Sequence, residues 1–200
     1  MKHILFSLFA AVVALLLAPT AQAQNNATQA RAILDKTAKV VGRSGGVSAS
    51  FTMNAPSTGS ISGKISVKGN KFYASTPPTT VWFNGKTQWT YMKKNNEVNV
   101  STPTAAQQQM MNPYTFINVY KSGYKLSTKR RRRAANKNHS IQEMYITVNK
   151  KTSVPSQIKM KHGNKWYTIS VRDFSAKNLP NSLFTFNSKD YPSAEVIDLR

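Results

Sequence analysis

The stretch VWFNGKTQWTYMKK, residues 81–94, decides the fold because its pattern is that of a β-hairpin. Asn84-Gly85 separates two runs of aromatic and β-branched residues, and an Asn-Gly pair in that setting favours a tight two-residue turn. Such a turn places Trp82 opposite Thr87, with side chains alternating between the two faces from there. The hairpin is therefore predicted to gather most of its aromatic residues on one face: Trp82, Trp89 and Tyr91.

Further strands are predicted on both sides of this hairpin. In ISGKISVKG, residues 61–69, apolar residues alternate with Ser and Lys, which indicates a strand with one solvent-exposed face. QIKMKHGNKWYTISV, residues 157–171, has the pattern of a second hairpin that turns at 162–165. Its apolar side consists of Ile158, Met160, Tyr167, Ile169 and Val171. IQEMYITV, residues 141–148, and LFTF, residues 183–186, are interpreted as two more strands.

Three helices are predicted beside the strands. Residues 26–43 place apolar side chains at helical spacing, with Asn26 as a cap and Gly42 as the end. Two shorter helices follow the pairs Thr102-Pro103 and Asn112-Pro113, because proline is favoured at the first helical position. Their larger apolar residues are Met110, Met111, Phe116, Ile117 and Tyr120. Helices inserted between strands in this way can cover the open side of a curved sheet.

These elements together predict a mainly β fold of the α+β type. Antiparallel strands separated by Gly, Pro, Asn and Ser indicate a curved sheet that forms an incomplete β-barrel. The N-terminal helix and the short helices would cover its open mouth. At this length a single domain, residues 24–200, is the expectation.

The first 23 residues have a pattern of their own. A basic residue near the start, an apolar run from Ile4 to Ala18 and the small-residue sequence Ala21-Gln22-Ala23 are typical of a signal peptide. We expect cleavage after Ala23 and export as a soluble protein. An N-terminal membrane anchor is the alternative, although the run is short beside the roughly 20 apolar residues of a bilayer span.

The composition is strongly basic and lacks cysteine. Against 28 Lys and Arg there are 7 Asp and Glu, which gives a formal net charge of +21. Such an excess attracts polyanions, which include nucleic acid, anionic lipid headgroups and acidic partners. The absence of cysteine excludes disulfides, a lipidation thiol and thiolate metal sites, so the chain must fold through its core alone.

The densest charge in the chain is the run Lys129, Arg130, Arg131, Arg132 and Arg133. Residues 121–172 hold fourteen of the 28 basic residues and one acid, so the excess is concentrated. A solvated hairpin tip is one interpretation of the run, and contact with an anionic membrane or a partner is the other. Nucleic acid is the least natural ligand for an exported chain, and the run lacks the interleaved aromatic residues of a stacking groove.

Patterns of catalytic and metal-binding residues are absent from the sequence. After residue 23 the only histidines are His139 and His162, and neither lies amid other candidate metal ligands. No two carboxylates are close enough in sequence to suggest an acid/base pair, and no G-x-S-x-G, H-E-x-x-H or phosphate-binding glycine loop is present. We expect no catalytic activity, no cofactor and no metal.

The aromatic and methionine side chains allow two interpretations. They can form an ordinary packed β-core, because large apolar residues are normally inside a protein. They can instead bound an apolar cavity, in which rigid aromatic walls and flexible methionines adapt to a ligand. The pattern alone does not separate the two.

Residues 63–100, GKISVKGNKFYASTPPTTVWFNGKTQWTYMKKNNEVNV, resemble the central signature of the LolA family of periplasmic lipoprotein carriers. The family pattern has a glycine-led strand, a second strand, a proline and a hairpin of the form apolar-x-D/N-G-K-T-x-W-x-Y, which residues 84–91 match. The resemblance continues at Asn112-Pro113 and in LFTFN, residues 183–187. The closing EVIDLR is similar to LolA-like chains of the Bacteroides group.

The resemblance implies a periplasmic chaperone that holds the acyl chains of lipoproteins in an apolar cavity between sheet and helices, and we expect it to act as a monomer. It would take its cargo from an inner-membrane ATP-driven extractor and pass it to an outer-membrane receptor. With the faces predicted above, the sheet's share of the cavity lining is Ile65, Phe72, Trp82, Trp89, Tyr91, Met144 and Ile146. The share of the covering helices is Met110, Met111, Phe116 and Ile117.

One position departs from the family pattern. The family usually has Arg-Pro after the glycine-led strand, and the resemblance implies that this arginine latches the helical lid. Here the sequence is Val67-Lys68-Gly69, so Lys68 is the nearest substitute for the latch. Lysine lacks the planar fork of arginine, so the two side chains are not equivalent donors.

Two other functions stay open on the sequence. One is a periplasmic carrier or sensor of another amphiphile, such as a glycolipid or a fatty acid. The other is a non-lipid adaptor whose basic face binds acidic envelope polymers.

Overall fold

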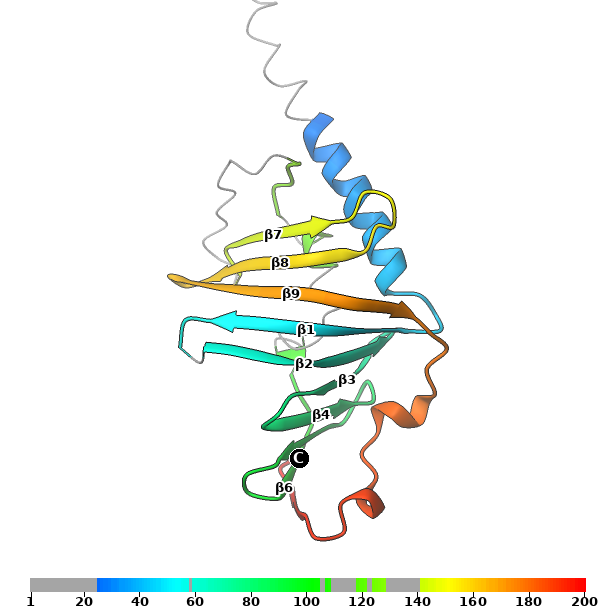
Figure 1. Cartoon of the computed structure of the whole chain (residues 1–200), viewed down its shortest axis with the longest axis vertical. Coiled ribbons are helices and arrows are strands. Elements are labelled where there is room, and N and C mark those ends of the chain that lie inside the picture. Colours follow the sequence, from blue (N-terminus) through cyan, green and yellow to red (C-terminus); the bar gives the residue numbers. More distant parts are fainter. Residues whose placement is uncertain (1–24, 58, 105–106, 109–117, 122–123, 129–140) are drawn as a thin grey trace, which may run out of the picture.

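The fold is seen in a computed structural model of the chain (Figure 1). It describes residues 25–57, 59–104, 107–108, 118–121, 124–128 and 141–200. The predicted signal peptide and the basic run at 129–133 lie outside these ranges, as do Met110, Met111, Phe116 and Ile117 of the predicted covering helices.

One ten-stranded sheet dominates the described residues, in the order β10-β6-β5-β4-β3-β2-β1-β9-β8-β7. Its strands are β1 (Val47–Ala55), β2 (Gly59–Lys68), β3 (Lys71–Ser75), β4 (Thr79–Phe83), β5 (Gln88–Met92), β6 (Glu97–Ser101), β7 (Glu143–Val148), β8 (Pro155–His162), β9 (Lys165–Ala176) and β10 (Glu195–Asp198). Two antiparallel meanders, β1 to β6 and β7 to β9, join where β9 pairs with β1. Because β7 and β10 are its two edges, the curved sheet is not closed.

These features confirm the predicted fold class, a mainly β, mostly antiparallel curved sheet with one N-terminal helix. The helix covers residues 25–41 and ends where the Gly42 N–H donates to the carbonyl oxygen of Ala38, at 2.8 Å. Asn26 lies inside this helix, so its predicted role as a cap is wrong. Among the described residues, no helix is both long enough and apolar enough to cross a membrane.

The helix packs on one face of the sheet, which we call the inner face. Its Val41 joins a buried cluster with four residues of β1 to β4, namely Val47, Val67, Phe72 and Phe83, and we call these five residues the helix-bound cluster. Burying each such side chain stabilises the fold by about 1.5–3 kcal/mol. The cluster therefore fixes the C-terminal end of the helix against β1 to β4, and the opposite face of the sheet is the outer face.

The aromatic hairpin forms as β4 and β5, but with a longer loop than predicted. Trp82 pairs with Trp89 rather than with Thr87, so residues 84–87 form the loop. The side-chain oxygen of Asn84 accepts from the N–H groups of Lys86 and Thr87, at 3.0 and 2.9 Å, and this holds the wider loop. The register differs from the prediction by two residues, which leaves every side chain on its predicted face.

The other strand patterns are confirmed except at the C-terminus. β8 and β9 pair as predicted, with His162 opposite Lys165 and Ile158 opposite Ile169. LFTF is not a strand, because Asn181–Phe184 form the 3-10 helix η2, whose Phe184 is fully buried. The last strand is β10, which runs parallel to β6 and so departs from the antiparallel pattern.

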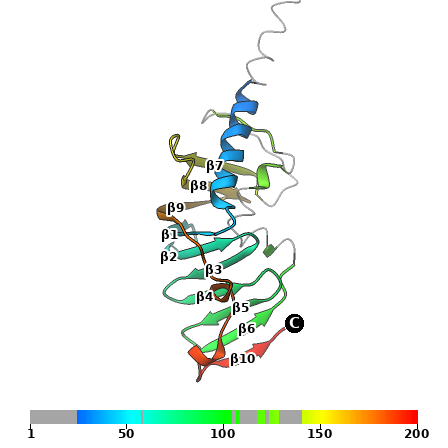
Figure 2. The same cartoon turned by 90° about the vertical axis from the view of Figure 1, so that its right-hand side faces the viewer.

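Only the fragments 107–108 and 118–121 of the predicted mid-chain helices are described, and the second lies beside the N-terminal helix (Figure 2). Val119–Lys121 form the 3-10 helix η1. Tyr120 in η1 is 4% exposed and its hydroxyl donates to the carboxylate of Asp35 in the N-terminal helix. Farther along, the Thr128 hydroxyl donates to the side-chain oxygen of Asn26, at 3.3 Å.

Candidate functional site

A row of apolar side chains crosses five neighbouring strands on the inner face. Strand pairing aligns its members directly: Ile61 of β2 with Met53 of β1, Met53 with Ile169 of β9, Ile169 with Ile158 of β8, and Ile158 with Ile146 of β7. We call these five residues the inner apolar row. Directly paired side chains lie about 4.5–5.5 Å apart, so the row is a continuous apolar strip.

The side chains of the inner apolar row are more exposed to solvent than those of the helix-bound cluster. Ile158 is 6% exposed, whereas the other four members are only half-buried. Met53 is six residues along β1 from Val47, a separation of roughly 20 Å at the rise of a strand. The row therefore lies well away from the contact between Val41 and the sheet.

A second apolar group borders the row at the β7 edge. Ile141 and Met160 are buried there, with Met144, Tyr167 and Ile169 packed against them. The hydroxyl of Tyr124 donates to the carbonyl oxygen of Ile141 at 2.6 Å. Burial raises the pKa of this Tyr124 hydroxyl above its usual value. The segment 124–128 is thus tied to the β7 edge and, through Asn26, to the helix.

On the other side of the row, Phe51 of β1 lies over Gly63 of β2. A Cβ at Gly63 would come within 2.9 Å of the Phe51 ring and 2.4 Å of the Ser75 carbonyl oxygen. Only a residue without a side chain leaves this space, so Gly63 lets the half-buried Phe51 ring extend the apolar strip along the sheet.

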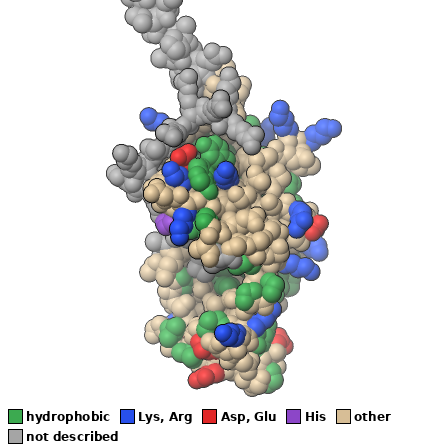
Figure 3. Space-filling model, turned by 60° about the vertical axis from the view of Figure 1, so that its left-hand side comes forward, with side chains coloured by type: hydrophobic (Ala, Val, Ile, Leu, Met, Phe, Trp, Pro, Cys, Tyr) green, Lys and Arg blue, Asp and Glu red, His purple; other side chains and the backbone are tan. Residues whose placement is uncertain are grey.

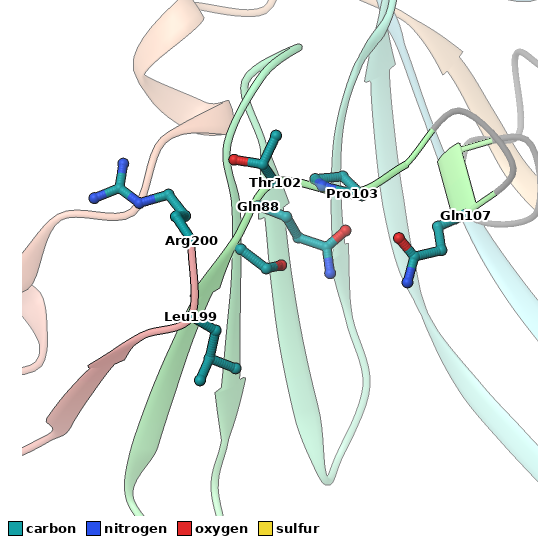
Figure 4. Close-up of a pocket in the computed structure, with 7 residues that line it drawn as sticks. Gln88, Thr102, Pro103, Gln107, Leu199 and Arg200 are labelled. Carbon is teal, nitrogen blue, oxygen red and sulfur yellow. The ribbon is translucent and has the colours of Figure 1, made fainter.

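Two cavities lie outside the row. One, of about 360 Å³, is lined by Ala27, Thr28 and Arg31 of the helix and by Tyr124, Lys125 and Leu126. The other, of about 310 Å³, lies where the C-terminus meets β5 and β6, and Leu199, Arg200, Pro103 and Gln107 line it (Figure 4). Gln88 also lines it, and its buried side-chain oxygen accepts no hydrogen bond from the residues that the structure describes. The cavity at the C-terminus has mixed polar and apolar walls, and the cavity beside the helix has mainly apolar walls.

Apolar side chains also gather on the outer face, but there they are covered by the chain itself. Trp82 lies 5.5 Å from Phe186 and 5.6 Å from Tyr191, between ring centroids. Tyr191 lies 4.7 Å from Tyr91. The pKa of the Tyr191 hydroxyl is raised by burial and by the nearby Tyr73, Tyr91 and Asp190. We call Tyr73, Trp82, Tyr91, Phe186 and Tyr191 the outer aromatic cluster.

Among the described residues, no three His, Cys, Asp or Glu side chains come together in a way that could hold a metal ion. Of the surfaces described above, the half-buried inner apolar row is the one suited to bind an elongated apolar ligand. A hydrophobic contact of this kind is proportional to the apolar area that it removes from water.

Comparison with known proteins assigns the chain to a family. A sequence profile of the outer membrane lipoprotein carrier protein LolA matches residues 20–164, well over half of the chain. The chain belongs to the LolA family. It is thus a member of a family of carrier proteins rather than of enzymes. No curated protein matches the chain in sequence.

Solved structures with a similar fold have low sequence identity to this LolA-family chain. An uncharacterized conserved protein from Thermus thermophilus is 14% identical with a TM-score of 0.58, over 85% of this chain and 99% of that one. A LolA superfamily protein from Nitrosomonas europaea is 12% identical with a TM-score of 0.41, over 78% and 97% of the two chains. At 14% identity, the likeness to the first structure shows a shared fold alone.

The residues predicted from the sheet to line one cavity lie on opposite faces. Trp82, Trp89 and Tyr91 share the outer face, which confirms the predicted aromatic face. Phe72 pairs with Phe83, and Ile65 with Ala74, on the inner face, where both pack with the helix-bound cluster. Met144 and Ile146 also belong to the inner face. The structure therefore brings Ile65, Phe72, Met144 and Ile146 onto one face and separates them from the three aromatic residues.

Lys68, the predicted substitute for the lid latch, contacts the C-terminal segment. Its side-chain nitrogen donates to the carbonyl oxygen of Leu179 at 2.6 Å, across 111 positions of sequence. Leu179 is buried and lies three residues after the end of β9. Within the described ranges, Lys68 thus ties β2 to the segment that leads to the outer aromatic cluster.

Sequence reasoning missed several members of the inner apolar row. Ile61, Ile158 and Ile169 were placed on predicted strands but not in the site, and Met53 and Phe51 were assigned to no element. The signal for β1 was present in VSASFTMNA, residues 47–55, where Val47, Ala49, Phe51, Met53 and Ala55 alternate with polar residues.

Proposed function

We propose that this chain is a periplasmic chaperone that binds the acyl chains of lipoproteins non-covalently and carries them from the inner to the outer membrane. Membership of a family of outer membrane lipoprotein carriers supports the class of cargo. The inner apolar row supports the place where the acyl chains bind. A signal peptide cleaved after Ala23 would direct export and leave one domain over residues 24–200.

The observation that carries the proposal is the half-buried inner apolar row across β2, β1, β9, β8 and β7. Each methylene that leaves water for an apolar surface contributes about 0.8 kcal/mol. A strip five strands wide spans roughly 19 Å at the spacing of strands in a sheet. An extended acyl chain can therefore lie along it and contact several side chains at once.

The covering residues and partners complete the proposal. Met110, Met111, Phe116 and Ile117 would close over the acyl chains from the mid-chain segment. Loading would come from an inner-membrane ATP-driven extractor and unloading from an outer-membrane receptor. Because Lys68 is bonded to the main chain of Leu179, release would not depend on Lys68 as a lid latch.

A displacement experiment tests the acyl-binding site. Purified chain 24–200 should bind a fluorescent fatty-acid analogue, and a natural lipoprotein with intact acyl chains should displace it. Ile61→Asn and Ile146→Asn, at the two ends of the row, should each weaken binding about tenfold, because a polar side chain removes apolar contact. Val196→Ser on β10 is the matched control, since Val196 is apolar, 50% exposed and far from the row in the sheet order.

The alternatives predict other outcomes of that experiment. Displacement by free fatty acid or glycolipid but not by a lipoprotein would favour a carrier or sensor of another amphiphile. No binding of the fluorescent probe at low or high salt would contradict every lipid-binding function. A non-lipid adaptor would bind acidic polymers instead, with an affinity that falls steeply as salt rises.

A further inference from the structure

The outer face of β7, β8 and β9 carries a group of aromatic and basic side chains that neither the lipid-binding row nor the core uses. Pairing places Glu143 opposite Lys161 and Lys161 opposite Trp166, and Tyr145 opposite Lys159. All five therefore point to the outer face. We call Tyr145, Lys159, Lys161 and Trp166 the outer basic patch.

The patch is organised by contacts between its own side chains. The rings of Tyr145 and Trp166 lie 5.8 Å apart at 30°, and the Lys159 nitrogen lies 4.9 Å from the Trp166 ring centroid. The Lys161 nitrogen is 3.8 Å from a carboxylate oxygen of Glu143. The other carboxylate oxygen of Glu143 accepts from the Tyr145 hydroxyl, at 3.2 Å. One tyrosine ring and one tryptophan ring thus lie together with two lysines on this face.

The patch remains accessible to solvent. Tyr145 is 36% exposed, Lys159 is exposed and Trp166 is half-buried. In the view that turns the left-hand side of Figure 1 forward, hydrophobic side chains lie between Lys and Arg side chains in the upper part of the molecule (Figure 3). The outer aromatic cluster differs, because the C-terminal segment packs on it and leaves Trp82 only 7% exposed.

Charge indicates the sign of the partner. From 141 to 172 the chain has six basic residues and one acid, Glu143. The pairing of Lys161 with Glu143 leaves Lys159, whose described contact is with the Trp166 ring, as uncompensated positive charge. An anionic partner is therefore favoured.

The shape and the residue types favour a bilayer over a polymer chain. The patch lies on an open sheet face, whereas the two cavities described above are lined by other residues. Tyrosine and tryptophan are enriched at the membrane interface, where their rings sit at headgroup level. Lysines beside them are attracted to anionic headgroups.

We propose that the outer basic patch is a docking surface for an anionic phospholipid bilayer. The inference deepens the proposed carrier function, on which its biological meaning rests, because a carrier must approach membranes to load and unload. β7 is an edge strand that directs Tyr145 to the outer face and Ile146 to the inner apolar row. Docking through this edge brings one end of the row close to the bilayer.

Vesicle binding tests the docking surface with the whole chain 24–200. The chain should bind vesicles that contain phosphatidylglycerol and should bind pure phosphatidylcholine vesicles weakly. Each lysine near an anionic surface accounts for a factor of about five in affinity, so Lys159→Gln with Lys161→Gln should weaken binding about 25-fold. The control pair, Lys86→Gln with Lys189→Gln, changes net charge equally at exposed positions elsewhere and should change binding less than about threefold.

A second measurement reports on position directly. Lipids brominated near the headgroup should quench the fluorescence of Trp166 in the bound chain. Trp166→Phe should abolish most of this quenching, since Trp82 is buried and Trp89 belongs to β5 near the other edge of the sheet.

Three results would overturn the docking surface. One is equal loss of binding in the patch variant and the control pair, which would indicate attraction by net charge alone. The second is quenching that persists in Trp166→Phe. The third is binding to an acidic polysaccharide, such as heparin, without binding to the vesicles. None of these three results depends on the acyl probe. Loss of probe binding would contradict the carrier function, whereas these three results would contradict the docking surface alone.

Discussion

The outer aromatic cluster and the inner apolar row are two apolar surfaces of the same sheet with different degrees of cover. In the cluster, Phe186 and Tyr191 from the C-terminal segment contact Trp82 and Tyr91 at ring distances of 4.7–5.6 Å. In the row, only Ile158 is buried, and the other four members are half-buried. Apolar content alone does not distinguish a core from a binding surface, whereas the presence of a cover from the same chain does.

The two surfaces therefore have different energetic roles. The cluster's contacts are satisfied within the chain, so its side chains stabilise the fold. The row keeps apolar area that a ligand can still remove from water. A substitution in the cluster should therefore lower stability, and one in the row should lower affinity for acyl chains.

The largest expected effect is on the stability of the cluster. Trp82→Ala removes a side chain that contacts Tyr73, Phe186 and Tyr191. It should lower the free energy of unfolding by about 3–5 kcal/mol, as for other buried Trp to Ala changes. Denaturant unfolding of chain 24–200 measures this. Loss of acyl-probe binding with unchanged stability would contradict the structural role of Trp82, because it would make Trp82 a ligand contact.

A smaller effect is expected at the residue that anchors the cover of the cluster. Lys68→Met removes the hydrogen bond to the Leu179 carbonyl oxygen and should lower the free energy of unfolding by about 1 kcal/mol. Affinity for the acyl probe should stay within about twofold of the parent chain. A large change in probe release in Lys68→Met, with little change in unfolding, would instead support a lid latch.

The smallest effect is a pH dependence of the cluster. The pKa of Tyr191 is raised above its ordinary value near 10 in the folded chain, so above about pH 10 the unfolded chain loses this proton first. Ionisation of Tyr191 should therefore leave the free energy of unfolding unchanged below about pH 10. The free energy of unfolding should then fall as pH rises through the pKa of Tyr191 in the folded chain. Tyr191→Phe should flatten that part of the profile, and an unchanged slope would mean that Tyr191 is not held in the cluster.

Much of the fold could be predicted from the sequence because alternation and turn residues are local signals. The face of Trp82, Trp89 and Tyr91 was predicted correctly even though the loop was not. The two-residue turn failed because Asn84 uses its side chain to bind the N–H groups of Lys86 and Thr87. The parallel strand β10 was missed, since its pairing with β6 joins residues about 98 positions apart and has no local signal.

The candidate site was harder to predict because it requires pairing between distant strands. In β3, Phe72 and Tyr73 are adjacent and both aromatic, so alternation does not indicate which one shares a face with Trp82. Pairing shows that it is Tyr73. Likewise, the alignment of Met53 with Ile169 depends on contact between β1 and β9, which are far apart in the chain.

Photolabelling tests most directly the claim that the inner apolar row, and not the outer aromatic cluster, binds acyl chains. Chain 24–200 would be irradiated with a fatty acid that carries a photoreactive group at its tail, and the labelled residues would be identified by mass spectrometry. Binding in the inner apolar row should place labels on Met53, Ile158 or Ile169 and their neighbours on β1, β8 and β9. Labels concentrated on Trp82, Tyr91 or Tyr191 would contradict it.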